Sequence, residues 1–143
     1  AMTGPWARDL KTDIAAIVDW GASTLVTLME SHELERLAVG GLGEMAQSQG
    51  LEWYHLPIRD VSVPSRAFEM AWVGAGRELR SRLLDGQSVV VHCRGGIGRT
   101  GLVAARLLVE LGEGPAAALS RVRSVRPGAV ETREQEAYVL ALR

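Results

Sequence analysis

The chain has 143 residues, of which 47% are hydrophobic and 23% charged, and its formal net charge is −1. This length fits one domain with a single core, and so small a charge gives no general attraction to nucleic acid or a membrane surface. The single cysteine, Cys93, has no partner for an internal disulfide, which is typical of a reducing compartment such as the cytoplasm. We therefore expect one domain over residues 8–143 after an N-terminal tail over residues 1–7, in which Ala1 and Met2 resemble a cloning remnant.

Apolar periodicity and turn residues divide the chain into alternating helices and strands. Helices are predicted, in chain order, over residues 12–21, 31–38, 42–48, 65–84, 99–111, 115–125 and 132–142. Short buried strands are predicted over residues 24–28, 51–56 and 88–92, and the last has the strongest strand character. This alternation predicts a three-layer α/β fold, with a central, mainly parallel sheet of about four strands flanked by helices.

The stretch that follows the last predicted strand is the most informative about chemistry. It reads His92-Cys93-Arg94-Gly95-Gly96-Ile97-Gly98-Arg99-Thr100. Glycines let the backbone curl so that successive N–H groups point inward, and the helix beyond them adds free N–H groups and partial positive charge. The predicted result is an anion cradle with a thiol at its base, in a field that favours the nucleophilic thiolate.

Each residue of this stretch has an expected role in phosphate chemistry. The planar guanidinium of Arg99 can hold two phosphate oxygens at once, which a lysine cannot do. Thr100 can place its hydroxyl near the sulfur and help the thiolate to leave a phosphocysteine intermediate. His92 is expected to hydrogen-bond the backbone of the loop. The predicted phosphate-binding residues are Arg94, Gly95, Gly96, Ile97, Gly98 and Arg99.

Two further residues are candidates for proton and water handling. Asp60 lies in a loop over residues 57–64 with proline at both ends, which can fold over the cradle, exclude water and protonate the leaving oxygen. Gln135, which follows a loop over residues 126–130, is a candidate for positioning the attacking water. Three scattered histidines and one cysteine show no metal-ligand spacing, so we expect no metal site.

The run from His92 to Thr100 matches the His-Cys-x5-Arg-[Ser/Thr] signature of protein tyrosine and dual-specificity phosphatases, and the chain resembles this superfamily over roughly residues 8–142. Within it the sequence is most similar to the cyclin-dependent-kinase-associated phosphatase and its bacterial relatives. This likeness rests on Glu33-Leu34, on residues 55–60 and on residues 129–135. The resemblance implies Cys93 as nucleophile, Arg99 as clamp, Asp60 as general acid and Thr100 as helper in the second step. It also implies that no metal and no organic cofactor is needed.

We expect a monomer that removes phosphate from phosphotyrosine, and also from phosphoserine or phosphothreonine, in a protein or peptide, with no nucleic-acid or membrane partner. Three alternatives remain open. The same chemistry could act on a phosphoinositide, an inositol phosphate or an RNA 5′ end, for which Arg94 is suitably basic and Ile97 is not. A phosphate-binding module without turnover would not need the full catalytic set, and a redox thiol enzyme would need a second cysteine.

Overall fold

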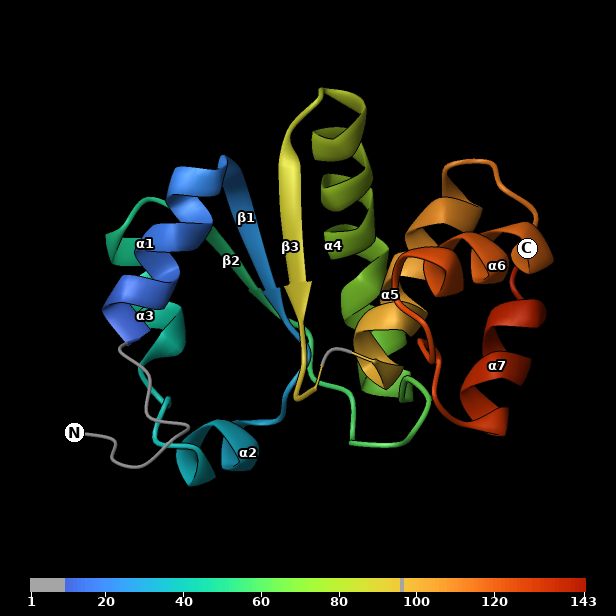
Figure 1. Cartoon of the computed structure of the whole chain (residues 1–143), viewed down its shortest axis with the longest axis horizontal. Coiled ribbons are helices and arrows are strands. Elements are labelled where there is room, and N and C mark those ends of the chain that lie inside the picture. The colour runs from blue at the N-terminus through green and yellow to red at the C-terminus, as the bar shows by residue number, and fades with distance from the viewer. Residues whose placement is uncertain (1–9, 96) are drawn as a thin grey trace.

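The computed structural model describes residues 10–143 apart from Gly96. Within them, three parallel strands form the sheet in the order β2-β1-β3 (Figure 1). The strands are β1 (Ala22–Thr27), β2 (Glu52–His55) and β3 (Ser88–His92). The helices are α1 (Leu10–Trp20), α2 (Ser31–Arg36), α3 (Leu42–Ser48), α4 (Arg66–Leu84), α5 (Gly98–Glu110), α6 (Pro115–Val125) and α7 (Arg133–Leu140).

Helices cover both faces of the sheet. Helices α1 and α3 pack on one face, α4 and α5 lie against the other, and α6 and α7 extend this second layer (Figure 1). Because successive side chains of a strand point to opposite faces, Leu25 belongs to the core under α1 and α3, whereas Val26 belongs to the core under α4 and α5. Each is at most 1% exposed, and burying such a side chain contributes about 1.5–3 kcal/mol.

The predicted α/β class and helix-flanked parallel sheet are confirmed, but the expected number of strands is wrong. The described residues contain three strands rather than about four. The segment between Pro57 and Pro64 adds none, because the prolines lack N–H donors and Val61 takes a left-handed conformation with φ +51°. The first helix also extends further toward the N-terminus than predicted, since it is already helical at Leu10.

The parallel arrangement determines where a site can form. All the strands have their carboxyl ends at one edge of the sheet, where ligands of such folds bind. From this edge β1 leads to α2, β2 leads to the loop before α4, and β3 leads to the glycine-rich loop before α5 (Figure 1). Within the described part of the chain, no helix is both long and apolar enough to cross a membrane.

Candidate active site

Cys93 directly follows β3 at the carboxyl edge of the sheet and is half-buried. The hydroxyl of Thr100, in the first turn of α5, donates to its Sγ atom at 3.0 Å. Gly95 has φ +84°, a conformation that glycine adopts without strain. Arg94 and Gly95, which follow Cys93, are exposed to solvent. Gly96 lies outside the described residues, so its contact with phosphate stays a prediction.

Arg99 is 1% exposed and is held by two segments from elsewhere in the chain. Its Nη1 donates to Oε2 of Glu33 at 2.7 Å and to the carbonyl of Ile58 at 3.0 Å, and its Nη2 donates to Oε1 of Glu33 at 3.0 Å. Burial alone would lower the pKa of Arg99, but the hydrogen bonds and charge of Glu33 raise it. The guanidinium therefore stays charged and fixed in orientation.

Glu33 is a residue of the site for which no role was predicted. It stands at the third position of α2 and forms a capping box with Glu30, which fixes the start of this short helix. Burial would raise the pKa of Glu33, but hydrogen bonds from Arg99 and from the Glu30 backbone lower it, so its carboxylate is ionised. The spacing of Glu30 and Glu33 is a sequence signal for the cap, but nothing local points to Arg99, which lies 66 positions away.

Asp60 is brought to the same place by the loop after β2. Its Oδ1 accepts from the backbone N–H of Val61 at 2.9 Å and lies 3.4 Å from Nη2 of Arg99. The Asp60 side chain is 58% exposed, so it faces solvent as well as the arginine. A carboxylate from one loop and a thiol from another are thus placed around one guanidinium.

Gln135 is fully buried beside both catalytic loops. Its Nε2 donates to the carbonyl of Ser62, and its Oε1 accepts from the backbone N–H groups of Glu131 and Thr132. The second loop it touches is the phosphate loop, where Gly98 packs directly against the glutamine amide. In this conformation the amide is committed to protein partners.

His92 lies behind Cys93 rather than on the phosphate side. Its Nε2 is 2.7 Å from Oγ1 of Thr27, and this hydroxyl also accepts from Nε1 of Trp53 at 2.8 Å. This nitrogen of the ring therefore contacts a side chain of β1, and a hydrogen bond from the ring to the loop backbone stays a prediction. Burial, with a smaller effect from His55, lowers the pKa of His92 to about 4, so the ring is neutral at physiological pH.

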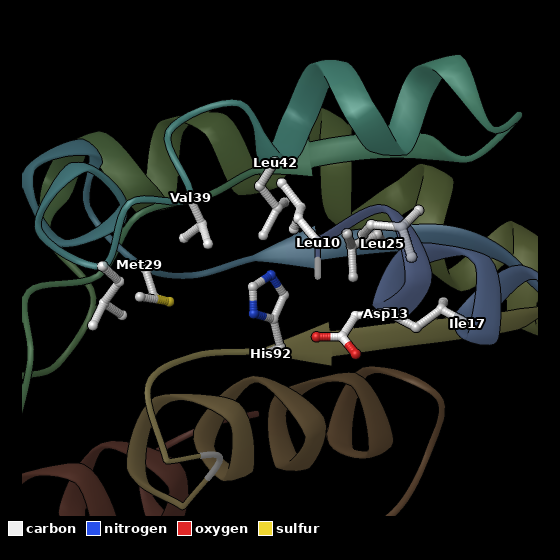
Figure 2. A pocket seen from close by; sticks show the side chains of 10 residues that line it. Leu10, Asp13, Ile17, Leu25, Met29, Val39, Leu42 and His92 are labelled. Atoms are coloured by element: carbon white, nitrogen blue, oxygen red, sulfur yellow. The ribbon is translucent and has the colours of Figure 1, made fainter. Parts of the chain in front are cut away.

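The His92 ring also forms part of the wall of an apolar pocket of about 420 Å³ on the α1 side of the sheet. Figure 2 shows the imidazole pointing into this pocket, between Met29 and Val39 on one side and Leu25 and Ile17 on the other. Leu25, Met29 and Val39 line this pocket together with the carboxylate of Asp13.

Arg126 ties the last loop to the phosphate loop, because its Nη2 donates to the carbonyl of Gly95 at 3.0 Å. In the same loop, the N–H of Val130 donates to the carbonyl of Ile97 at 3.0 Å. These carbonyls are held outward, as expected for a loop whose N–H groups turn inward. No group of three or more His, Cys, Asp and Glu side chains within the described residues could hold a metal ion.

The site combines a thiol at the end of a parallel strand, a buried arginine at the start of the next helix and a carboxylate on a neighbouring loop. Together these features define a class of protein. The fold and the site are those of phosphatases of the protein tyrosine and dual-specificity type.

Comparison with known proteins agrees with this class. Residues 1–113 match the family described as "Polymorphic toxin system, DSP-PTPase phosphatase". The chain belongs to this family, within the dual-specificity phosphatase superfamily that the sequence resemblance implied.

Similar curated proteins include the cyclin-dependent kinase inhibitor 3 of Rattus norvegicus and that of Homo sapiens. Each is 30% identical over 135 residues, which cover 92% of this chain and 62% of the relative. The chain thus spans less than two thirds of the length of these relatives.

Solved structures include a kinase-associated phosphatase in which the catalytic-site cysteine was replaced by serine. It has a TM-score of 0.83 and 29% identity, over 92% of this chain and 74% of that one. Tk-PTP in its active form has a TM-score of 0.74 and 32% identity, over 91% of this chain and 82% of that one.

Proposed function

We propose that this phosphatase removes phosphate from phosphotyrosine, and also from phosphoserine or phosphothreonine, in proteins, with Cys93 as the nucleophile. The observation that carries the proposal is the 3.0 Å hydrogen bond from Thr100 to the sulfur, at the base of a loop that ends in a clamped Arg99. Two kinds of relative support the substrate class. One is a kinase-associated phosphatase, and another is a putative tyrosine phosphatase of Invertebrate iridescent virus 3, 36% identical over 93 residues.

In the first step the Sγ of Cys93 attacks the phosphorus and the ester P–O bond breaks. Asp60 gives its proton to the leaving oxygen, and the product is a phosphocysteine. The inward N–H groups of the loop and Arg99 stabilise the charge on the transferring group. Among the described residues, Glu33 and Ile58 use three of the five guanidinium donors. The Nε–H and the second N–H of Nη2 remain for two phosphate oxygens, although Nη2 also lies 3.4 Å from Oδ1 of Asp60.

In the second step water attacks the phosphorus and the S–P bond breaks. Asp60 takes a proton from the water, and Thr100 donates its hydroxyl hydrogen bond to the departing thiolate, which lowers the cost of expelling it. Inorganic phosphate leaves and the enzyme returns to its starting state.

An aryl phosphate assay under reducing conditions tests the chemistry. We expect clear hydrolysis by the wild type, none by Cys93→Ser, and a kcat about 10²- to 10⁴-fold lower in Asp60→Asn, because a general acid contributes on this order. Asp19→Asn is the matched control, since Asp19 is exposed on α1 away from the site. If the wild type were inactive, the proposed phosphatase activity would be wrong. If Asp60→Asn hydrolysed the substrate at the wild-type rate, Asp60 would not be the general acid.

A substrate panel tests the proposed class. The exposed Arg94 and Gly95 leave the mouth of the loop open, which suits side chains shorter than phosphotyrosine as well. We expect phosphotyrosine peptides to have the highest kcat/KM, with measurable turnover of phosphoserine and phosphothreonine peptides. A higher kcat/KM for phosphoinositides, inositol phosphates or 5′-phosphorylated RNA would replace the protein substrate by that class.

A further inference from the structure

We propose that Gln135 is a positioning residue that holds the Asp60 loop against the phosphate loop and thereby sets proton donation, instead of orienting the attacking water. The inference rests on the proposed function, in which Asp60 is the general acid. It gives Gln135 a part in the first step of the reaction rather than in the second.

The two ends of the Gln135 amide have different and complementary partners. Its Nε2 donates to the Ser62 carbonyl at 2.9 Å, whereas its Oε1 accepts from the N–H groups of Glu131 at 3.0 Å and Thr132 at 3.1 Å. A carbonyl can only accept and an N–H can only donate, so the opposite orientation of the amide would lose all three bonds. The side chain is also fully buried, so water does not compete for these partners.

The same amide rests on the phosphate loop. A Cβ atom added at Gly98 would lie 3.0 Å from Oε1 and 3.2 Å from Nε2 of Gln135, closer than most such contacts. Gly98 is the first residue of α5 and lies five positions after Cys93. One side chain therefore joins the acid loop, the start of α7 and the phosphate loop, and three of the four hydrogen-bonding positions of its amide are taken by protein partners.

The loop that carries Asp60 contains a strained residue, which neighbouring contacts must hold in place. Val61, next to Asp60, has φ +51°, a conformation that β-branched residues rarely adopt and that neighbouring contacts must maintain. The turn is tight, with the N–H of Ser62 donating to the carbonyl of Arg59 at 3.1 Å. The bond from Gln135 reaches this turn from outside, one residue after the strained position. Without it we expect the turn to relax and Asp60 to leave its place.

Two variants separate the hydrogen bond donated by Nε2 of Gln135 from those accepted by its Oε1. Gln135→Ala removes both, whereas Gln135→Glu keeps the acceptor that caps α7, as a capping box allows, and loses the donor to Ser62 at neutral pH. The readout is kcat/KM for aryl phosphates of graded leaving-group pKa, because kcat/KM reports the steps through phosphocysteine formation. We expect both variants to lose about tenfold or more with a leaving group of pKa about 10 and little with a far more acidic one, since only the former needs the acid.

Thr132→Ala is the matched control. It removes the hydroxyl that caps α7 by accepting from the Gln135 N–H at 3.0 Å, but it keeps the donor arm to Ser62. We expect it to lower the melting temperature without changing the leaving-group dependence. If Thr132→Ala reproduced the kinetics of the Gln135 variants, the effect would be fraying of α7, and the positioning role would be wrong.

The double variant with Asp60→Asn completes the test. If Gln135 acts through Asp60, Gln135→Ala should slow the Asp60→Asn enzyme no further. If Gln135→Ala kept its kcat/KM but released a burst of the leaving alcohol or phenol, the slow step would be hydrolysis of the phosphocysteine. Gln135 would then act in the attack by water, and the inference would be overturned. A fully active Asp60→Asn would overturn the proposed general acid, whereas a slow Asp60→Asn beside an unimpaired Gln135→Ala would overturn the positioning role alone.

Discussion

Removing the carboxylate of Glu33 should weaken both the fold and the catalysis, because Arg99 is buried and depends on it. The pair is joined by two hydrogen bonds of 2.7 and 3.0 Å, and the side chains are 1% and 9% exposed for Arg99 and Glu33. Breaking a buried pair by removing one partner costs about 3–5 kcal/mol, because the remaining charge is left uncompensated. Asp60 and the Ile58 carbonyl stay beside the guanidinium, so we expect about 3 kcal/mol for Glu33→Ala and somewhat less for Glu33→Gln.

Urea unfolding and steady-state kinetics measure the two effects. The urea concentration at the midpoint of unfolding should fall with an unchanged m-value. The kcat/KM for an aryl phosphate should fall by about 10²-fold, because a displacement of about 1 Å in a group that positions the substrate lowers the rate by about this factor. Glu35→Gln is the matched control, since Glu35 lies on the same helix and is exposed. If Glu33→Gln were as stable and active as Glu35→Gln, the pair would have no part in holding the clamp.

Other predictions follow from the packing and titration of the site. Gly101→Ala should destabilise the fold by about 1–3 kcal/mol, because its Cβ would lie 2.9 Å from the backbone nitrogen of Val130, and an unchanged melting temperature would show that the two segments can separate freely. The pKa of His92, lowered to about 4 in the fold, lies below the ordinary value of about 6.5, so the unfolded chain binds the extra proton between these pH values. The neutral His92 ring therefore contributes its full stabilisation of the fold above pH 6.5. This contribution decreases as the pH falls toward 4, and about 2 kcal/mol of it is lost by pH 5. Denaturation at pH 7.5 and pH 5 should show this loss in the wild type and not in His92→Gln, and equal losses in both would refute it. Peroxide should inactivate the enzyme at Cys93 and a thiol reductant should restore it, whereas full activity after peroxide treatment would contradict Cys93 as an accessible nucleophile.

The phosphate loop could be predicted from sequence because its parts are neighbours in the chain. Cys93 and Thr100 are seven positions apart, and a strand followed by a helix leaves few ways to join them. Asp60 could be placed because the carboxyl ends of parallel strands meet at one edge of the sheet. Glu33 received no role because its partner is distant in sequence, and a glutamate at the start of a helix is explained equally well as a cap.

The order of the strands shows another limit of the sequence. The most strand-like run, Ser88–His92, lies at the edge of the sheet, and its residues are all half-buried, whereas the central strand β1 is almost entirely buried. In a sheet covered by helices on both faces, edge and central strands are similarly apolar, so composition does not distinguish them. The side-chain partners of Gln135 and His92 were equally hidden, because they depend on which loops and strands become neighbours in space.

The position of Arg99 explains why stability and catalysis are linked in this site. Glu33 partly balances the charge of the guanidinium, so in the proposed mechanism the N–H groups of the loop and the start of α5 also attract the phosphate dianion. Arg99 adds its charge and the orientation of its two remaining donors. That orientation is fixed by Glu33 on α2 and by the Ile58 carbonyl after β2, each of which is also a packing contact between segments. A substitution that loosens either segment therefore affects the transition state even when it lies far from the sulfur.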